Sequence, residues 1–148
     1  MSVTCALAIS AVGIAAVSDA LTGYIFDGLL AAGLTATMSA ALFEHRVAES
    51  AFGAIAAFIV MLAIRCASGG RGLGFGDVKV ALLIGAGLGP MEGVVAIGSA
   101  FVAGTAFALP LLAAGRLRYG SPVRFGPYLL AGSLCDLAYH RLSAGVFP

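Results

Sequence analysis

The chain consists of apolar stretches that alternate with short polar breaks, and this pattern constrains its fold more than any other feature. The stretches cover residues 3–18, 25–43, 51–64, 80–88, 94–114 and 127–139. A helix that crosses a bilayer needs roughly 20 apolar residues, and only the second and fifth stretches approach that length. The others need flanking polar side chains that reach toward water, or they end inside the protein. We therefore expect an all-α membrane bundle of about six transmembrane helices.

The composition also indicates a membrane protein. Of the 148 residues, 61% are hydrophobic and 10% are charged. A soluble domain needs a polar surface, which this chain cannot supply. The length predicts one membrane-embedded domain over residues 1–148, with the lipid bilayer as its surroundings. The net charge of +1 and the lack of a basic stripe argue against a nucleic-acid partner. Cys5, Cys66 and Cys135 are too far apart in sequence to predict a zinc site.

Basic residues are unevenly distributed over the polar breaks. If successive breaks alternate between the two sides of a membrane, Arg46 and Arg141 share one side. The other side then carries Arg65, Arg71, Lys79, Arg116, Arg118 and Arg124. Breaks that are rich in Lys and Arg stay in the cytoplasm. We therefore expect the breaks at 19–24, 65–79 and 115–126 to lie inside the cell.

Ionisable residues at membrane depth are costly and are therefore candidates for function. Asp19 ends the first stretch, Asp27 follows the start of the second, Asp77 precedes the fourth and Asp136 lies within the sixth. The predicted topology places Asp19 and Asp77 on the same, cytoplasmic side. Two carboxyl groups that come together can share one proton, so that one serves as base and the other as acid. This is the chemistry of aspartyl proteolysis.

Small residues accompany both of these aspartates. Helical steps back from Asp19 reach Ala15, Ala11 and Ala8, and steps forward from Asp77 reach Ala81, Gly85 and Gly89. Such rows allow membrane helices to approach closely, although Ala and Gly are common enough here for chance rows. The segment 69–77 holds five glycines and ends on Asp77. Glycine permits close backbone approach, and a flexible linker is the alternative interpretation.

Several segments resemble one known family. Residues 74–79, GFGDVK, resemble the GxGD signature of type IV prepilin peptidases, which is typically followed by Val-Lys. The glycine-rich segment 85–89 and the segment 125–129, FGPYL, also look like that family. Residues 18–25, SDALTGYI, are similar to its first aspartate block. That block usually continues with Ile-Pro-Asn or Ile-Pro-Asp, whereas this chain has Ile25-Phe26-Asp27.

The resemblance implies an intramembrane aspartyl endopeptidase that removes the basic leader of type IV prepilins or pseudopilins. The site would face the cytoplasm from a multi-pass protein of the bacterial inner membrane. Asp19 and Asp77 match the family's catalytic pair, and Gly74, Gly76, Lys79 and Asp27 are expected to bind substrate or support the site. No metal or other cofactor is required. The chain resembles short members without the cysteine-bearing cytoplasmic domain, so we expect a cleaved product with an unmethylated amine.

Alternatives stay open at Lys79, at Asp27 and for the whole chain. Lys79 either pairs with a carboxylate or extends to the membrane surface. Asp27 is either a third site carboxylate or a cap of the second helix. Asp136 and His140, four residues apart, are expected to form a structural pair. A small carboxylate-based transporter would need aspartates deep within its spans and internal symmetry. A non-catalytic membrane scaffold would need no pair of aspartates.

Overall fold

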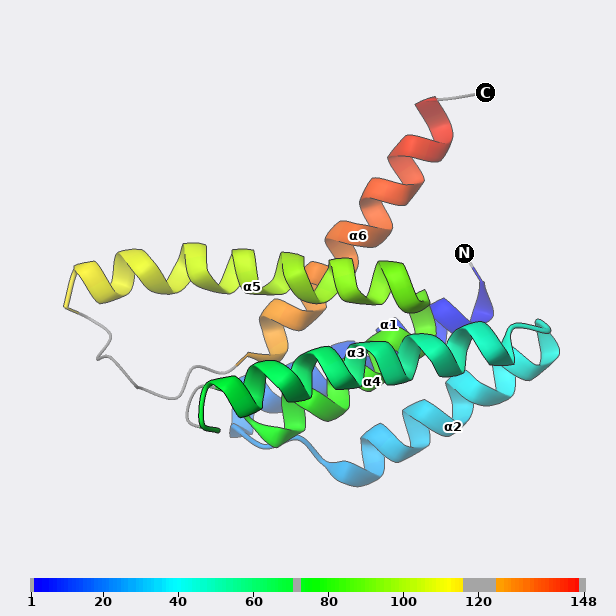
Figure 1. Ribbon diagram of the computed structural model, residues 1–148, viewed down its shortest axis with the longest axis horizontal. Coiled ribbons are helices and arrows are strands. Elements are labelled where there is room, and N and C mark those ends of the chain that lie inside the picture. Colours follow the sequence, from blue (N-terminus) through cyan, green and yellow to red (C-terminus); the bar gives the residue numbers. More distant parts are fainter. Residues whose placement is uncertain (1, 71–72, 116–124, 147–148) are drawn as a thin grey trace.

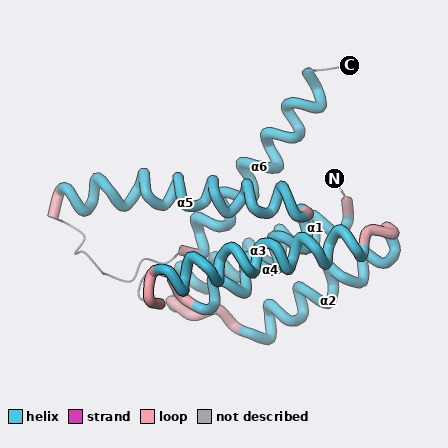
Figure 2. The backbone as a smooth tube through the Cα atoms, viewed as in Figure 1, coloured by secondary structure: helices cyan, strands magenta, loops and turns pink. Residues whose placement is uncertain are grey.

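A computed structural model describes residues 2–70, 73–115 and 125–146. Within these ranges the chain forms six α-helices and no strand, which confirms the predicted all-α bundle. The helices are α1 (Val3–Thr22), α2 (Asp27–Phe43), α3 (Val47–Ala67), α4 (Phe75–Leu88), α5 (Pro90–Ala113) and α6 (Gly126–Val146). The first five helices run in alternating directions, whereas α6 crosses α5 at a steep angle and its second half projects from the others (Figure 1). Short loops connect the first five helices (Figure 2).

The helix lengths correct one prediction. The helices α1, α3 and α5 contain 20, 21 and 24 residues and are apolar enough to cross a membrane. Helix α2 contains 17 residues, so the second stretch is shorter than a full span and the first and third are longer than expected. The difference arises because helices continue into flanking polar residues. Helix α1 runs past the buried Asp19, and α3 includes Arg65, whose guanidinium donates to the carbonyl of Leu73.

Helix α4 is the central helix of the bundle. It contacts all five other helices, and the side chains of Val78, Val80, Leu83 and Ile84 are buried. Its 14 residues rise by about 21 Å, which is less than the ~30 Å hydrocarbon core of a bilayer. Helix α4 by itself is therefore too short to cross a bilayer, and the neighbouring helices enclose it.

Glycines set the distances between helices. A Cβ atom on Gly85 of α4 would lie 2.0 Å from the carbonyl oxygen of Gly53 in α3. A Cβ atom on Gly93 of α5 would lie 2.8 Å from the Cα of Gly85. Gly85, a member of the predicted small-residue row of α4, therefore lies between α3 and α5. Helix α1 contacts α4 through Ala8, which a Cβ on Gly87 would approach to 2.2 Å.

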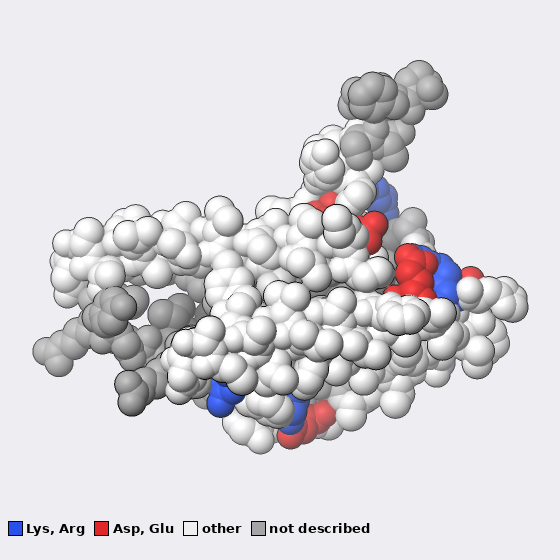
Figure 3. Space-filling model, viewed as in Figure 1, with Lys and Arg blue, Asp and Glu red and all other residues white. Residues whose placement is uncertain are grey.

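Polar contacts close the end of the bundle where α2 meets α3. Glu44 accepts hydrogen bonds from the backbone N–H of Val3 at 2.5 Å and from Oγ1 of Thr4 at 2.7 Å. Arg46 and Glu49 form an ion pair at 2.7 Å. Figure 3 shows these charged atoms gathered at one end, while most of this face of the bundle is uncharged. The long sides of the helices are thus suited to contact with lipid.

Candidate active site

The structure brings Asp19 and Asp77 to the same end of the bundle. Asp19 lies near the end of α1, which stops at Gly23 because this residue adopts a left-handed φ of 69°. Asp77 is the third residue of α4. Both are buried, with relative exposures of 7% and 6%. Together they line one cavity of about 300 Å³, called the carboxylate cavity below.

Every residue that the sequence singled out for the site lines this cavity. Its walls come from the end of α1 and the following loop, the start of α2 and the start of α4. The lining residues are Asp19, Gly23, Tyr24, Ile25, Asp27, Gly74, Phe75, Gly76, Asp77 and Lys79. Among the described residues, no three His, Cys, Asp or Glu side chains are arranged to hold a metal ion.

The start of α4 positions Asp77. Its Oδ2 accepts a hydrogen bond from the backbone N–H of Gly74 at 3.2 Å, so the aspartate caps the helix to which it belongs. A Cβ on Gly74 would lie 3.2 Å from that same oxygen. A Cβ on Gly76 would lie 3.0 Å from Cδ1 of Ile25. Both glycines therefore keep space free, one beside the carboxylate and the other against the loop after α1.

The start of α6 positions Asp19. Its Oδ2 accepts a hydrogen bond from the backbone N–H of Gly126 at 3.1 Å. Gly126 is the first residue of α6, and the first N–H groups of a helix have no partner within it. A Cβ on Gly126 would lie 2.8 Å from Oδ2 of Asp19, so glycine leaves room for the carboxylate. The sequence identified segment 125–129 only by resemblance and did not predict this contact.

Lys79 and Asp27 form an ion pair at the edge of the cavity. The Nζ of Lys79 lies 2.7 Å from Oδ1 of Asp27, and the two side chains are 34% and 67% exposed. Of the two interpretations of Lys79, pairing with a carboxylate is the one observed. Asp27 is the first residue of α2, whereas Phe26 occupies the N-cap position without a side-chain hydrogen bond. The capping interpretation of Asp27 is therefore corrected, because its carboxylate is turned toward α4.

Phe75 is a cavity residue that the sequence reasoning missed. Its ring lies 5.8 Å from Cζ of Arg65 and 5.3 Å from Nζ of Lys79, so it receives two cation–π contacts. An aromatic residue between the glycines of a GxGD motif was the available signal. Four of the basic residues used for the topology, Arg71, Arg116, Arg118 and Arg124, lie outside the described residues.

The sequence model of the type IV leader peptidase family matches residues 6–109, a range that includes Asp19, Asp27 and Asp77. The chain belongs to this family. It is 35% identical over 131 residues to proteins of Burkholderia pseudomallei strains 1026b and K96243, each described as a prepilin leader peptidase/N-methyltransferase. The match covers 82% of this chain and 41% of each relative, so the chain spans well under half of their length. No solved structure matches the chain.

The loop after α1 shows how this member of the leader peptidase family does without the proline of its first aspartate block. Phe26, which replaces that proline, has φ −73° and ψ 119°. Proline would impose a φ of about −65 ± 15°, so the backbone already has a proline-compatible conformation. The side chain of Ser18 donates to the carbonyl of Tyr24 at 2.9 Å. Thr22 also donates to that carbonyl, at 3.2 Å.

The fourth aspartate is remote from the carboxylate cavity. Asp136 is buried in α6, and its Oδ1 lies 3.8 Å from Nε2 of His140, one helical turn away. The two residues line a separate cavity of about 200 Å³ together with Cys5 and Arg46, at the opposite end of the bundle. They are thus placed as a structural pair, away from Asp19 and Asp77.

Proposed function

We propose that this chain is an aspartyl endopeptidase that cleaves the leader from prepilins or pseudopilins. One observation carries the proposal. Two buried carboxyl groups, Asp19 from α1 and Asp77 from α4, line a single cavity although 58 residues separate them in a chain of this family. The names of the relatives, prepilin leader peptidase/N-methyltransferase, indicate the class of substrate. Of the two activities in these names, we propose the peptidase reaction for this chain.

The pair supplies both functions that hydrolysis of a peptide bond requires. Two buried carboxyl groups that share a cavity cannot both ionise at low cost, so together they hold one proton. The ionised member takes a proton from a water molecule, and the resulting hydroxide attacks the carbonyl carbon of the scissile bond. The protonated member donates its proton to the carbonyl oxygen. The tetrahedral intermediate then collapses, the C–N bond breaks and a proton returns to the leaving amine.

The two aspartates act as one titrating unit in this proposal, and neither is assigned permanently as acid or base. The hydrogen bonds from Gly126 and Gly74 hold one oxygen of each carboxyl group, which leaves the other oxygens for water and substrate. Preorganised groups of this kind lower the barrier because they need little rearrangement during the reaction. The short α4 supports the proposal, since it allows Asp77 to act within the membrane thickness.

We further propose that the carboxylate cavity opens toward the cytoplasm. Arg65 and Lys79 lie at its end of the bundle, and the polar breaks at 65–79 and 115–126 contain the other basic residues assigned to that side. Loops rich in Lys and Arg remain in the cytoplasm. A prepilin leader would then be removed from the cytoplasmic side of the bacterial inner membrane.

Conservative substitutions of the two aspartates test the proposal. Asp19→Asn and Asp77→Asn should each abolish cleavage of a prepilin while the protein still inserts into membranes, because asparagine keeps the shape but cannot exchange the proton. Asp136→Asn is the matched control, since it removes a buried carboxyl group outside the cavity. Asp27→Asn should reduce kcat less than about tenfold, as an exposed ion pair contributes only ~0–1 kcal/mol.

Cleavage is measured from the mass of the new N-terminus of the prepilin. Full activity of either Asp19→Asn or Asp77→Asn would disprove an aspartyl mechanism that uses this pair. An Asp27→Asn variant as inactive as Asp77→Asn, together with an active Asp19→Asn variant, would show that Asp27 is the true partner of Asp77.

A further inference from the structure

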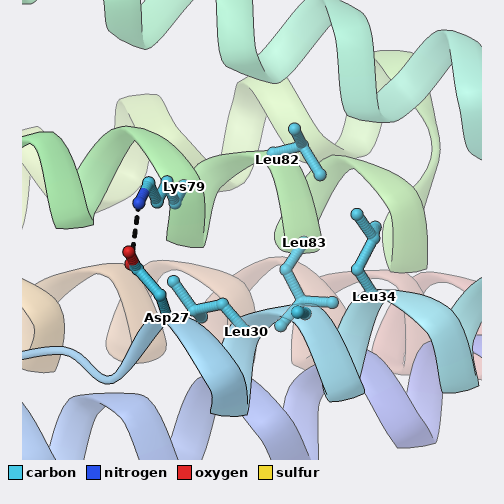
Figure 4. A pocket seen from close by; sticks show the side chains of 7 residues that line it. Asp27, Leu30, Leu34, Lys79, Leu82 and Leu83 are labelled. Carbon is cyan, nitrogen blue, oxygen red and sulfur yellow. Dashed lines mark hydrogen bonds and ion pairs between the residues drawn. The ribbon is translucent and has the colours of Figure 1, made fainter.

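A second cavity lies directly beside the carboxylate cavity. It has a volume of about 250 Å³ and runs between α2 and α4. Its lining residues, which define the α2–α4 groove, are Asp27, Leu30, Ala31, Leu34, Lys79, Leu82 and Leu83. Figure 4 shows Leu30 and Leu34 of α2 opposite Leu83 of α4, with the ion pair of Asp27 and Lys79 at one end.

The groove and the carboxylate cavity are continuous. Asp27 and Lys79 line both of them, so this ion pair forms the boundary between a polar compartment and an apolar one. The two aspartates that we propose for catalysis lie on one side of the boundary. Beyond Asp27 and Lys79, every residue that lines the groove is leucine or alanine.

The groove is about two helical turns long. Along α2 its lining extends from Asp27 to Leu34, which corresponds to a rise of about 10 Å or two helical turns. Ala31, midway along this wall, is exposed. An apolar segment can therefore enter sideways from the bilayer and does not have to thread through the bundle.

We propose that the α2–α4 groove binds an apolar segment of the substrate that directly follows the scissile bond. This inference rests on the proposed function and specifies where its substrate lies. The ion pair of Asp27 and Lys79 sets the register, because an apolar side chain placed against it would remove water from two charges without replacing their hydrogen bonds. The apolar segment must begin beyond the pair, which places the preceding peptide bond in the carboxylate cavity.

The groove selects against polar side chains, just as the ion pair of Asp27 and Lys79 selects against apolar ones. A polar side chain pressed into the leucine wall would lose its hydrogen bonds to water, so a substrate whose polar region extends too far is disfavoured. Within a bilayer, close packing rather than transfer out of water holds apolar helices together. The small side chain of Ala31 leaves room for such packing in the middle of the groove.

Filling the groove tests this inference. Ala31→Phe places a ring in the groove, and the matched control Ala36→Phe places one on the same helix at an exposed position that does not line it. With a full-length prepilin in lipid nanodiscs, Ala31→Phe should raise KM about tenfold and leave kcat largely unchanged. Ala36→Phe should leave both parameters as in the unsubstituted protein.

A photo-crosslinking amino acid at the same two positions identifies the occupant independently of activity. With Asp77→Asn to prevent turnover, position 31 should crosslink to the apolar segment of the prepilin within its first two turns, and position 36 should not. Crosslinks from position 31 to lipid alone, or equal KM values for the two Phe variants, would overturn the groove proposal. If Asp19→Asn and Asp77→Asn were inactive in that case, the proposed function would stand; a wild-type chain that cleaves no prepilin would overturn both.

Discussion

The backbone N–H of Gly126 donates a hydrogen bond to Oδ2 of Asp19 across 107 residues of sequence. This contact joins the start of α6 to the end of α1 at the carboxylate cavity. Its distance is 3.1 Å, and the N-terminal amides of a helix favour a negative charge placed beside them. The position of α6 is therefore coupled to the orientation of one of the two proposed catalytic carboxyl groups.

Substitution of Gly126 should impair catalysis through this contact. In Gly126→Ala, the new Cβ would lie 2.8 Å from Oδ2 of Asp19 and must displace the carboxylate. We expect kcat to fall by about 100-fold with little change in KM, the size of effect caused by a misplacement of about 1 Å.

Two alanine variants separate this effect from a general disturbance of packing. A Cβ on Gly98 of α5 meets nothing within 4 Å, so Gly98→Ala should behave like the unsubstituted protein. A Cβ on Gly132 would lie 2.2 Å from the carbonyl of Ala96, so Gly132→Ala should lower stability while the folded protein keeps its kcat. A kcat of Gly126→Ala equal to that of the unsubstituted protein would show that the contact does not position Asp19.

Gly85→Ala should destabilise the bundle at its centre. The added Cβ would lie 2.0 Å from the carbonyl oxygen of Gly53, and neither backbone can yield without separating α3 from α4. Overpacking of this kind costs about 1–3 kcal/mol. Thermal unfolding in detergent should show a lower midpoint for Gly85→Ala and an unchanged or higher one for Gly98→Ala, which gains helix propensity. Equal midpoints would contradict the close approach of α3 and α4.

The loop after α1 should accept the proline that the family usually carries. Because the φ of Phe26 is −73°, Phe26→Pro restricts the unfolded chain without straining the folded one. The substitution also removes a ring contact with Tyr24, whose centroid lies 5.3 Å away. The proper comparison is therefore Phe26→Ala, relative to which Phe26→Pro should be more stable by about 0.4–1 kcal/mol. A proline variant less stable than the alanine variant would indicate a different loop conformation.

Glu44 should make the far end of the bundle sensitive to acid. The hydrogen bond from the Thr4 hydroxyl, together with backbone N–H groups, lowers the pKa of Glu44 below its ordinary value of 4.5. A carboxyl group with a lowered folded-state pKa contributes stability above its unfolded pKa and loses it as the pH falls through the folded value. Below about pH 4.5, the unfolding midpoint should therefore fall further for the unsubstituted chain than for Glu44→Gln. Parallel midpoints for the two proteins would contradict this role.

Much of the architecture could be predicted from the sequence because it depends on neighbouring residues. The apolar stretches predicted six helices, and the described residues form six. The predicted helix ends were less accurate, since Asp19 and Arg65 continue their helices by using partners outside those helices. The candidate site residues were recognised from the GxGD segment and the first aspartate block, and all of them line the carboxylate cavity.

Local sequence determined the membrane class and the number of helices, because both follow from hydropathy along the chain. It also determined that Asp19 and Asp77 lie at the same end of the bundle, because successive helices alternate in direction. The tertiary structure alone decided how each helix is rotated about its axis. That rotation turns Gly85 toward Gly53, places the N–H of Gly126 against Asp19 and brings Lys79 within 2.7 Å of Asp27. These contacts form where small residues allow the backbones of two helices to approach closely. Such an approach depends on residues from both helices, so it cannot be read from one stretch of sequence.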